Sequence, residues 1–187
     1  MLDKYVCLEK LAARRRDELV VSTMSVAMPW SRLSDGPLDF ASVDSAMGHA
    51  ADFAYGLAMA QARRVICLNG DGSTLMCLGT LATMAQRPVD NFTLVITENG
   101  TYEVTGNQPV PSAGVVDYAA VARGAGIQRV FTIDNDADFD ALLPLHFNGG
   151  GPTVMVWKID RAKEPVPKPE RPIRERALRL RQALVEA

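Results

Sequence analysis

Residues 64–73, RVICLNGDGS, decide the fold, because a short apolar run ends there in an aspartate between two glycines. The apolar half is typical of a buried strand of a parallel sheet, and Asp71 follows where that strand would end. A second apolar run at 92–97 ends in the same way, in Asn99-Gly100. Ligands of open α/β sheets bind beyond the carboxyl ends of the strands, so we expect both polar clusters at one site.

The two clusters differ in chemistry but suit a single ligand. Asp71 offers a carboxylate and Asn99 a carboxamide, and Mg²⁺ prefers oxygen ligands of both kinds. The glycines let backbone amides approach a phosphate closely, and a helix that begins near Ser73 would point its N-terminus at that phosphate. A metal-bound diphosphate would therefore explain all these residues. The alternative interpretations are an ordinary helix cap at Asp71 and a left-handed turn at Asn99.

The interval between the GDG segment at 70–72 and Asn99 resembles that of the diphosphate-binding domain of thiamine diphosphate enzymes. Residues 45–50, SAMGHA, are similar to the segment that precedes GDG in the phosphonopyruvate and sulfopyruvate decarboxylases of this family. Residues 105–109, TGNQP, resemble their loop after the metal-binding asparagine, and residues 20–23, VVST, resemble their first strand. The resemblance extends over roughly residues 15–160.

The resemblance implies roles for individual residues. It predicts Mg²⁺ held by Asp71, Asn99 and the backbone carbonyl of Thr101, and an apolar wedge, Met47, beneath the folded cofactor. A methionine that merely fills the core, and a histidine satisfied at a helix start, are the other interpretations of Met47 and His49. The complete set of cofactor-binding residues expected on this basis is Thr23, Ser45, Met47, Gly48, His49, Gly70, Gly72, Ser73 and Tyr102.

The resemblance also implies an activity, that of a carboxy-lyase that removes CO₂ from a 2-oxo acid with thiamine diphosphate and Mg²⁺. The glutamate that activates the cofactor in this family belongs to a pyrimidine-binding domain, for which 187 residues filled by one domain leave no room. We therefore expect a subunit that works with a separate, alpha-type pyrimidine-binding subunit in a homo- or hetero-oligomer. Its own catalytic residues are not assigned. Glu103 departs from the glycine or aspartate expected here, and its carboxylate would disfavour a dianionic substrate.

Three alternatives remain open. The beta subunit of a 2-oxoacid:ferredoxin oxidoreductase has the same domain, but Cys7, Cys67 and Cys77 are too scattered to hold an iron–sulfur cluster. A transketolase-like half would have longer insertions. An α/β scaffold that keeps the cofactor cradle without catalysis is the non-enzyme alternative.

Composition narrows the classes of partner and compartment. The net charge of −2 gives no basic field for nucleic acid. Apolar runs are too short to span a bilayer, and the N-terminus has no signal-peptide core. The odd number of cysteines, read as buried thiols, favours the reducing cytoplasm. We expect no function for His146, which falls in a segment expected at the surface.

The pattern of apolar residues alternates between helix and strand, which predicts a doubly wound α/β fold, a mainly parallel sheet with helices on both faces. We divide the chain into a cofactor-binding domain at 1–161 and a proline-rich linker with a C-terminal helix, which could pack on a partner, at 162–187. The small residues of 46–60 are the expected contact between subunits. The expected strands are 19–23, 65–68, 92–97, 128–133 and 153–159, and the expected helices are 4–16, 48–62, 74–85, 117–124, 136–143 and 173–185.

Overall fold

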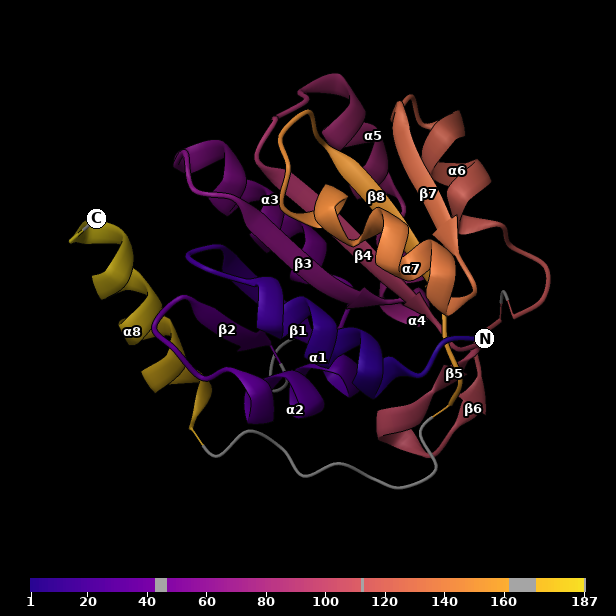
Figure 1. The fold of residues 1–187 in the computed structure, drawn as a ribbon, viewed down its shortest axis with the longest axis horizontal. Coiled ribbons are helices and arrows are strands. Elements are labelled where there is room, and N and C mark those ends of the chain that lie inside the picture. The colour runs from indigo at the N-terminus through magenta and orange to yellow at the C-terminus, as the bar shows by residue number, and fades with distance from the viewer. Residues whose placement is uncertain (43–46, 112, 162–170, 187) are drawn as a thin grey trace.

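The computed structural model, which describes residues 1–42, 47–111, 113–161 and 171–186, is built around a six-stranded sheet (Figure 1). The strand order is β2-β1-β3-β4-β8-β7, and every neighbouring pair is parallel. The chain proceeds from β1 to β2 on one side and to β3 on the other, so the order reverses beside β1, where such sheets bind ligands. The strands are β1 (Leu19–Thr23), β2 (Asp39–Ser42), β3 (Val65–Gly70), β4 (Phe92–Glu98), β7 (Arg129–Ile133) and β8 (Thr153–Lys158).

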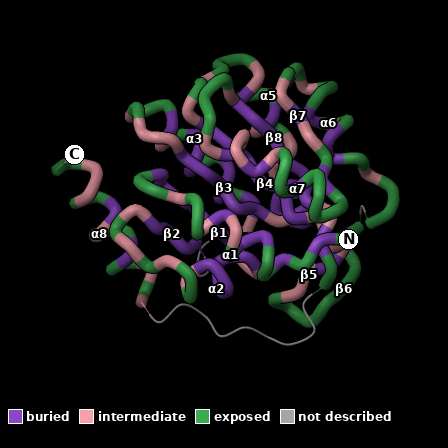
Figure 2. Tube along the Cα trace, in the orientation of Figure 1, coloured by how far each residue is buried: buried purple, intermediate pink, exposed green. Residues whose placement is uncertain are grey.

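Helices cover both faces of the sheet, which confirms the predicted doubly wound fold (Figure 1). Successive side chains of a strand point to opposite faces, so Val65 and Cys67 of β3 join one hydrophobic cluster and Ile66 and Leu68 the other. Figure 2 shows the buried residues concentrated in these strands. The helices are α1 (Lys4–Arg14), α2 (Met24–Leu33), α3 (Ala50–Ala60), α4 (Asp71–Met76), α5 (Gly79–Gln86), α6 (Tyr118–Gly124), α7 (Asp136–Leu142) and α8 (Ile173–Val185).

Two regions differ from the pattern expected from the sequence. The segment 24–42, for which the sequence pattern predicts no element, forms α2 and the edge strand β2. A proline inside α2 and two polar residues among the four of β2 obscure both patterns. The helix expected at 74–85 is two helices, because the backbone leaves the helical region at Cys77 before Gly79 starts α5.

The interval 98–114 contains a short hairpin of β5 (Thr101–Tyr102) and β6 (Gln108–Pro109), with a 3₁₀ turn at Glu103–Thr105.

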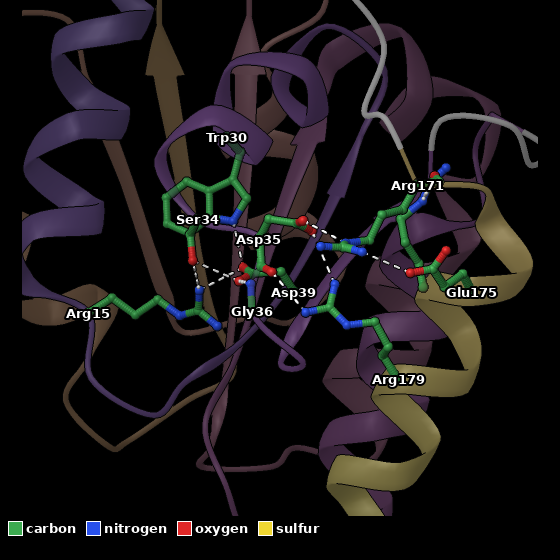
Figure 3. Close-up of polar contacts among 10 residues, drawn as sticks. Arg15, Trp30, Ser34, Asp35, Gly36, Asp39, Arg171, Glu175 and Arg179 are labelled. Atoms are coloured by element: carbon green, nitrogen blue, oxygen red, sulfur yellow. Dashed lines mark hydrogen bonds and ion pairs between the residues drawn. The ribbon is translucent and has the colours of Figure 1, made fainter.

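The C-terminal helix α8 packs on the edge strand β2 of its own chain and adds Leu180 to the core. Figure 3 shows the polar contacts that hold it there. Asp35 accepts from Arg171 Nε at 2.8 Å, and its backbone oxygen accepts from Arg179 at 3.0 Å. Asp39 of β2 accepts from Trp30 Nε1 at 2.8 Å and from Arg15 at 2.6 Å. A domain boundary at 161 stays a prediction, since 162–170 lie outside the described residues.

Two expectations about burial are wrong. His146, expected at the surface, is completely buried beneath α7. Its Nε2 accepts a hydrogen bond from Trp157 Nε1 at 3.2 Å there. Cys7 and Cys67 are buried as expected, but Cys77 is partly exposed because it lies at the break between α4 and α5. Among the described residues, no helix has the length and apolar character needed to cross a bilayer.

Candidate functional site

A pocket opens where β1, β3 and β4 end, at the point where the strand order reverses. The structure brings into its lining most of the residues expected from the sequence. Parallel strands direct their carboxyl ends to the same edge, so residues that follow different strands converge there. The expected residues that line the pocket are Met47, Gly70, Asp71, Gly72, Ser73, Asn99, Thr101 and Tyr102.

Asp71 is a buried carboxylate at the start of α4. Its two oxygens accept from the backbone amides of Gly72, at 2.8 Å, and Gly100, at 2.7 Å. Burial raises the pKa of Asp71, although these amide donors act in the opposite direction. Among the described residues, no lysine, arginine or histidine forms an ion pair with it. Its negative charge therefore lies in a polar cradle that has no protein cation.

The end of β4 is fixed to the end of β3. Thr97 Oγ1 donates to the backbone oxygen of Asn69 at 2.9 Å, and Gly100 N reaches Asp71 across the same gap. Asn99 turns the chain, since its Oδ1 accepts from Thr101 N at 2.9 Å. The carboxylate and the carboxamide thus come from two strands whose ends are tied together.

Gly72 is needed for close packing. A Cβ at this position would collide with the ring of Tyr102, which lies over the GDG turn. Gly48 approaches from the other side with a positive φ of 100°, and its amide donates to Ser73 Oγ at 3.0 Å. The turn is therefore enclosed by residues from two distant segments.

Three of the described residues that we expect to bind the cofactor do not line the pocket. Thr23 is buried, and its Oγ1 donates to Ser42 O at 3.2 Å outside the pocket lining. His49 is exposed, with Nδ1 3.0 Å from Asp52 Oδ2. Gly48 is not part of the pocket lining, although its amide donates to Ser73 Oγ, which is. Ser45 lies outside the described residues.

The pocket also contains residues that sequence reasoning missed. Met24, with an unusual φ of 49°, and Ser25 follow directly after β1 and line the pocket with Val104 and Thr97. The position of β1 was predicted correctly, so the rule that strand ends share one edge would have identified Met24 and Ser25.

Glu103 lines the same pocket, but its charge is compensated. Lys4 Nζ at the start of α1 lies 2.7 Å from Glu103 Oε2, and the side chains are 2% and 8% exposed. The expectation that this carboxylate repels an anionic substrate omitted the lysine, which lies far away in the sequence.

Comparison with known proteins agrees with this geometry. The family described as "Thiamine pyrophosphate enzyme, C-terminal TPP binding domain" matches residues 22–157. The chain belongs to this family. The resemblance predicted from the GDG segment and Asn99 is confirmed.

The proteins to which this chain is similar include decarboxylases. Sulfopyruvate decarboxylase subunit beta of Methanothermobacter thermautotrophicus is 35% identical over 146 residues, 78% of this chain and 77% of the relative. Phosphonopyruvate decarboxylase of Streptomyces viridochromogenes is 34% identical over 154 residues, 81% of this chain but 38% of the relative. The crystal structure of benzoylformate decarboxylase from Polynucleobacter necessarius has a TM-score of 0.69 at 17% identity over 88% of this chain and 34% of that one, a likeness of fold alone.

Proposed function

We propose that this chain is the cofactor-binding subunit of a thiamine diphosphate- and Mg²⁺-dependent decarboxylase that acts on a 2-oxo acid of the sulfopyruvate or phosphonopyruvate type. The observation that carries the proposal is the pocket in which Asp71 and Asn99, from the ends of β3 and β4, face one space with Met47 and Tyr102. Its membership of the thiamine pyrophosphate family and the decarboxylase names of its relatives support the same conclusion.

The donors present fit a magnesium ion. Asp71 is a buried carboxylate that has two backbone amide donors but no paired cation among the described residues, so a divalent ion would compensate its charge. A carboxylate has about four lone pairs, more than these amide donors use. Asn99 Oδ1 and the Thr101 carbonyl would complete an oxygen-only set, which suits Mg²⁺ rather than a softer metal.

The residues around the GDG turn also fit a diphosphate. Ser73, in the first turn of α4, lines the pocket with the glycines, where amide and hydroxyl donors can face phosphate oxygens. Met47 offers an apolar surface on which the two rings of the cofactor would be held. When bound, thiamine diphosphate supplies a carbon nucleophile for the 2-oxo carbonyl and a ring that accepts the electron pair as CO₂ leaves.

The remaining lining residues would surround the substrate. Val104 and Thr105 lie beside the pocket on the 3₁₀ turn, and Lys4 holds Glu103 in an ion pair there. We propose that an alpha-type partner subunit supplies the acid that activates the cofactor. The relative named "subunit beta", of which this chain covers 77%, supports such a division.

The test is cofactor binding by Asp71→Ala. We expect the affinity for thiamine diphosphate, measured by titration calorimetry with Mg²⁺, to fall by at least about a hundredfold, since even supporting groups around a metal contribute 10–100-fold. Chelation of Mg²⁺ should lower the affinity of the wild-type protein for thiamine diphosphate by the same factor. Asp90→Ala, an exposed acid that precedes β4 at its opposite end, is the matched control. Equal affinities of Asp71→Ala and the wild-type protein would contradict the metal assignment.

A further inference from the structure

A second group of potential metal ligands lies outside the cofactor pocket. His49, Asp52 and Cys77 each offer one ligand atom, and these atoms all lie within 4.8 Å of one another. His49 Nδ1 is 3.0 Å from Asp52 Oδ2 and 3.8 Å from Cys77 Sγ. We propose that these three residues bind a soft divalent cation of the Zn²⁺ class, at a site separate from the Mg²⁺ site at Asp71.

The distances suit a tetrahedral zinc site. With Zn–N near 2.0–2.1 Å and Zn–S near 2.3 Å, adjacent ligand atoms are about 3.3–3.7 Å apart. The observed separations of Asp52 and Cys77 from His49 lie within a few tenths of an ångström of that range. The ligand atoms of Asp52 and Cys77 are at most 4.8 Å apart, so rotations of these partly exposed side chains would have to bring that pair into the same range.

The backbone fixes these residues in place. Gly48 lies so close to the end of α4 that a Cβ there would be 3.1 Å from Met76 Cβ and 3.3 Å from Cys77 Sγ. Its amide is also bound to Ser73 Oγ at 3.0 Å. His49 directly follows, and the break after α4 turns Cys77 toward it. The close approach of two distant segments thus brings the imidazole to the thiol.

A supporting group and an open side are also present. Thr80 Oγ1 donates to Asp52 Oδ1, which orients the carboxylate as outer groups do around metals. Asp52, Cys77 and Thr80 line a surface groove with Tyr55 and Met59. The side chains of His49 and Asp52 are 64% and 41% exposed. A fourth ligand, either water or a group from a bound molecule, can enter from this groove.

The chemistry separates this site from the pocket. Thiolate and imidazole select Zn²⁺ and related ions over Mg²⁺, whereas the Asp71 site offers only oxygen. Binding displaces the thiol proton of Cys77 to solvent and leaves one proton of His49 on Nε2. The charges of Cys77 and Asp52 then balance that of the ion.

The test uses the untagged, purified full chain with Zn²⁺ and with Co²⁺ as a spectroscopic probe. We expect about one ion per chain and a near-ultraviolet thiolate-to-cobalt band that Zn²⁺ abolishes and excess Mg²⁺ leaves unchanged. Cys77→Ser should lose this band. His49→Gln and Asp52→Asn should weaken Zn²⁺ binding by at least about tenfold.

Two controls separate this proposal from the proposed function. Asp90→Asn, on another surface, and Asp71→Ala should both keep the cobalt band, although Asp71→Ala loses Mg²⁺-dependent cofactor binding. Circular dichroism checks that each variant is folded. If Cys77→Ser does not fold, the surface variant His49→Gln takes its place as the test of the site. The proposal is overturned if the wild-type protein shows no cobalt band. It is also overturned if the band persists in folded Cys77→Ser, or if it is as strong in folded His49→Gln as in the wild-type protein.

Discussion

At the scale of single residues, buried charges differ in how they are compensated. Among the described residues, the partners of Asp71 are backbone amides, and burial raises its pKa. Lys4 is equally buried but is paired directly with Glu103, which itself lines the pocket. A buried charge without an opposite charge beside it is costly, so Asp71 is the residue that a bound cation would stabilise.

The ion pair between Lys4 and Glu103 gives the first prediction. Lys4→Met removes the cation from a buried carboxylate, and loss of one partner of such a pair costs about 3–5 kcal/mol. Denaturant unfolding should show this loss in the free energy of unfolding. The double variant Lys4→Met/Glu103→Leu, which removes both charges, should recover most of it. A single variant as stable as the wild-type protein would mean that the pair is exposed to solvent.

His146 gives a prediction about pH. Burial lowers the pKa of His146 from 6.5 to about 4. The unfolded chain therefore binds this proton near pH 6.5, whereas the folded chain does not until about pH 4. Neutral His146 therefore contributes fully to the free energy of unfolding above pH 6.5. This contribution decreases as the pH falls and has dropped by about 3 kcal/mol near pH 4.

The measurement compares urea unfolding of the wild-type protein and of His146→Gln between pH 7 and pH 4.5. Gln cannot titrate but can still accept from Trp157, so the variant should lose less stability over this range. Parallel pH profiles of the two proteins would show that His146 does not titrate as inferred.

At the scale of elements, helix α8 covers an edge of the sheet. Strand β2 is the last strand on its side, and an uncovered edge strand invites pairing with other chains. Leu180 joins the core beside β2, while Asp35 receives Arg171 and Arg179 (Figure 3). The basic helix, which could pack on a partner, therefore packs on its own chain through the side that carries Leu180.

Two leucines of α8 test this packing. Leu180 is 3% exposed and Leu178 is 52% exposed. Leu180→Asp should destabilise the protein by at least about 1.5–3 kcal/mol, the contribution of a buried leucine, and should reduce amide protection in α8 and β2. Leu178→Asp should change the free energy of unfolding by no more than about 0.5 kcal/mol. Equal effects of the two substitutions would contradict the docking of α8.

At the scale of the whole molecule, the described residues form a six-stranded sheet with the candidate cofactor pocket at the carboxyl ends of its strands. Among the described residues, the carboxylates that line the pocket are Asp71, bound to two amides, and Glu103, bound to Lys4. Neither is free to act as the activating acid. The small residues of α3 that we expected between subunits mostly pack inside the chain, whereas Gly56 faces outward.

We therefore predict that the isolated chain binds thiamine diphosphate with Mg²⁺ but does not decarboxylate sulfopyruvate, phosphonopyruvate or pyruvate. Adding an alpha-type subunit should produce CO₂ release, which a coupled assay or NMR of the 2-oxo acid would follow. The same mixture with Asp71→Ala should be inactive and so exclude a contaminant. Turnover by the chain alone, absent from Asp71→Ala, would mean that the activating acid is its own.

The sequence by itself determined five of the six strands of the sheet, their parallel arrangement and the core of the candidate site. Buried parallel strands are continuous apolar runs, and their carboxyl ends share one edge, so Asp71 and Asn99 had to converge once their strands were recognised. Helix α6 was also predictable, since Asp117 caps it through a local bond to Ala120 N.

Only the tertiary structure decided which distant residues meet. It buried His146 against Trp157, paired Lys4 with Glu103, and brought Cys77 to His49. None of these contacts follows from a spacing, because each depends on how elements formed locally pack against one another. Strand and turn patterns are local properties of the chain, whereas charge compensation and side-chain burial belong to the packed molecule.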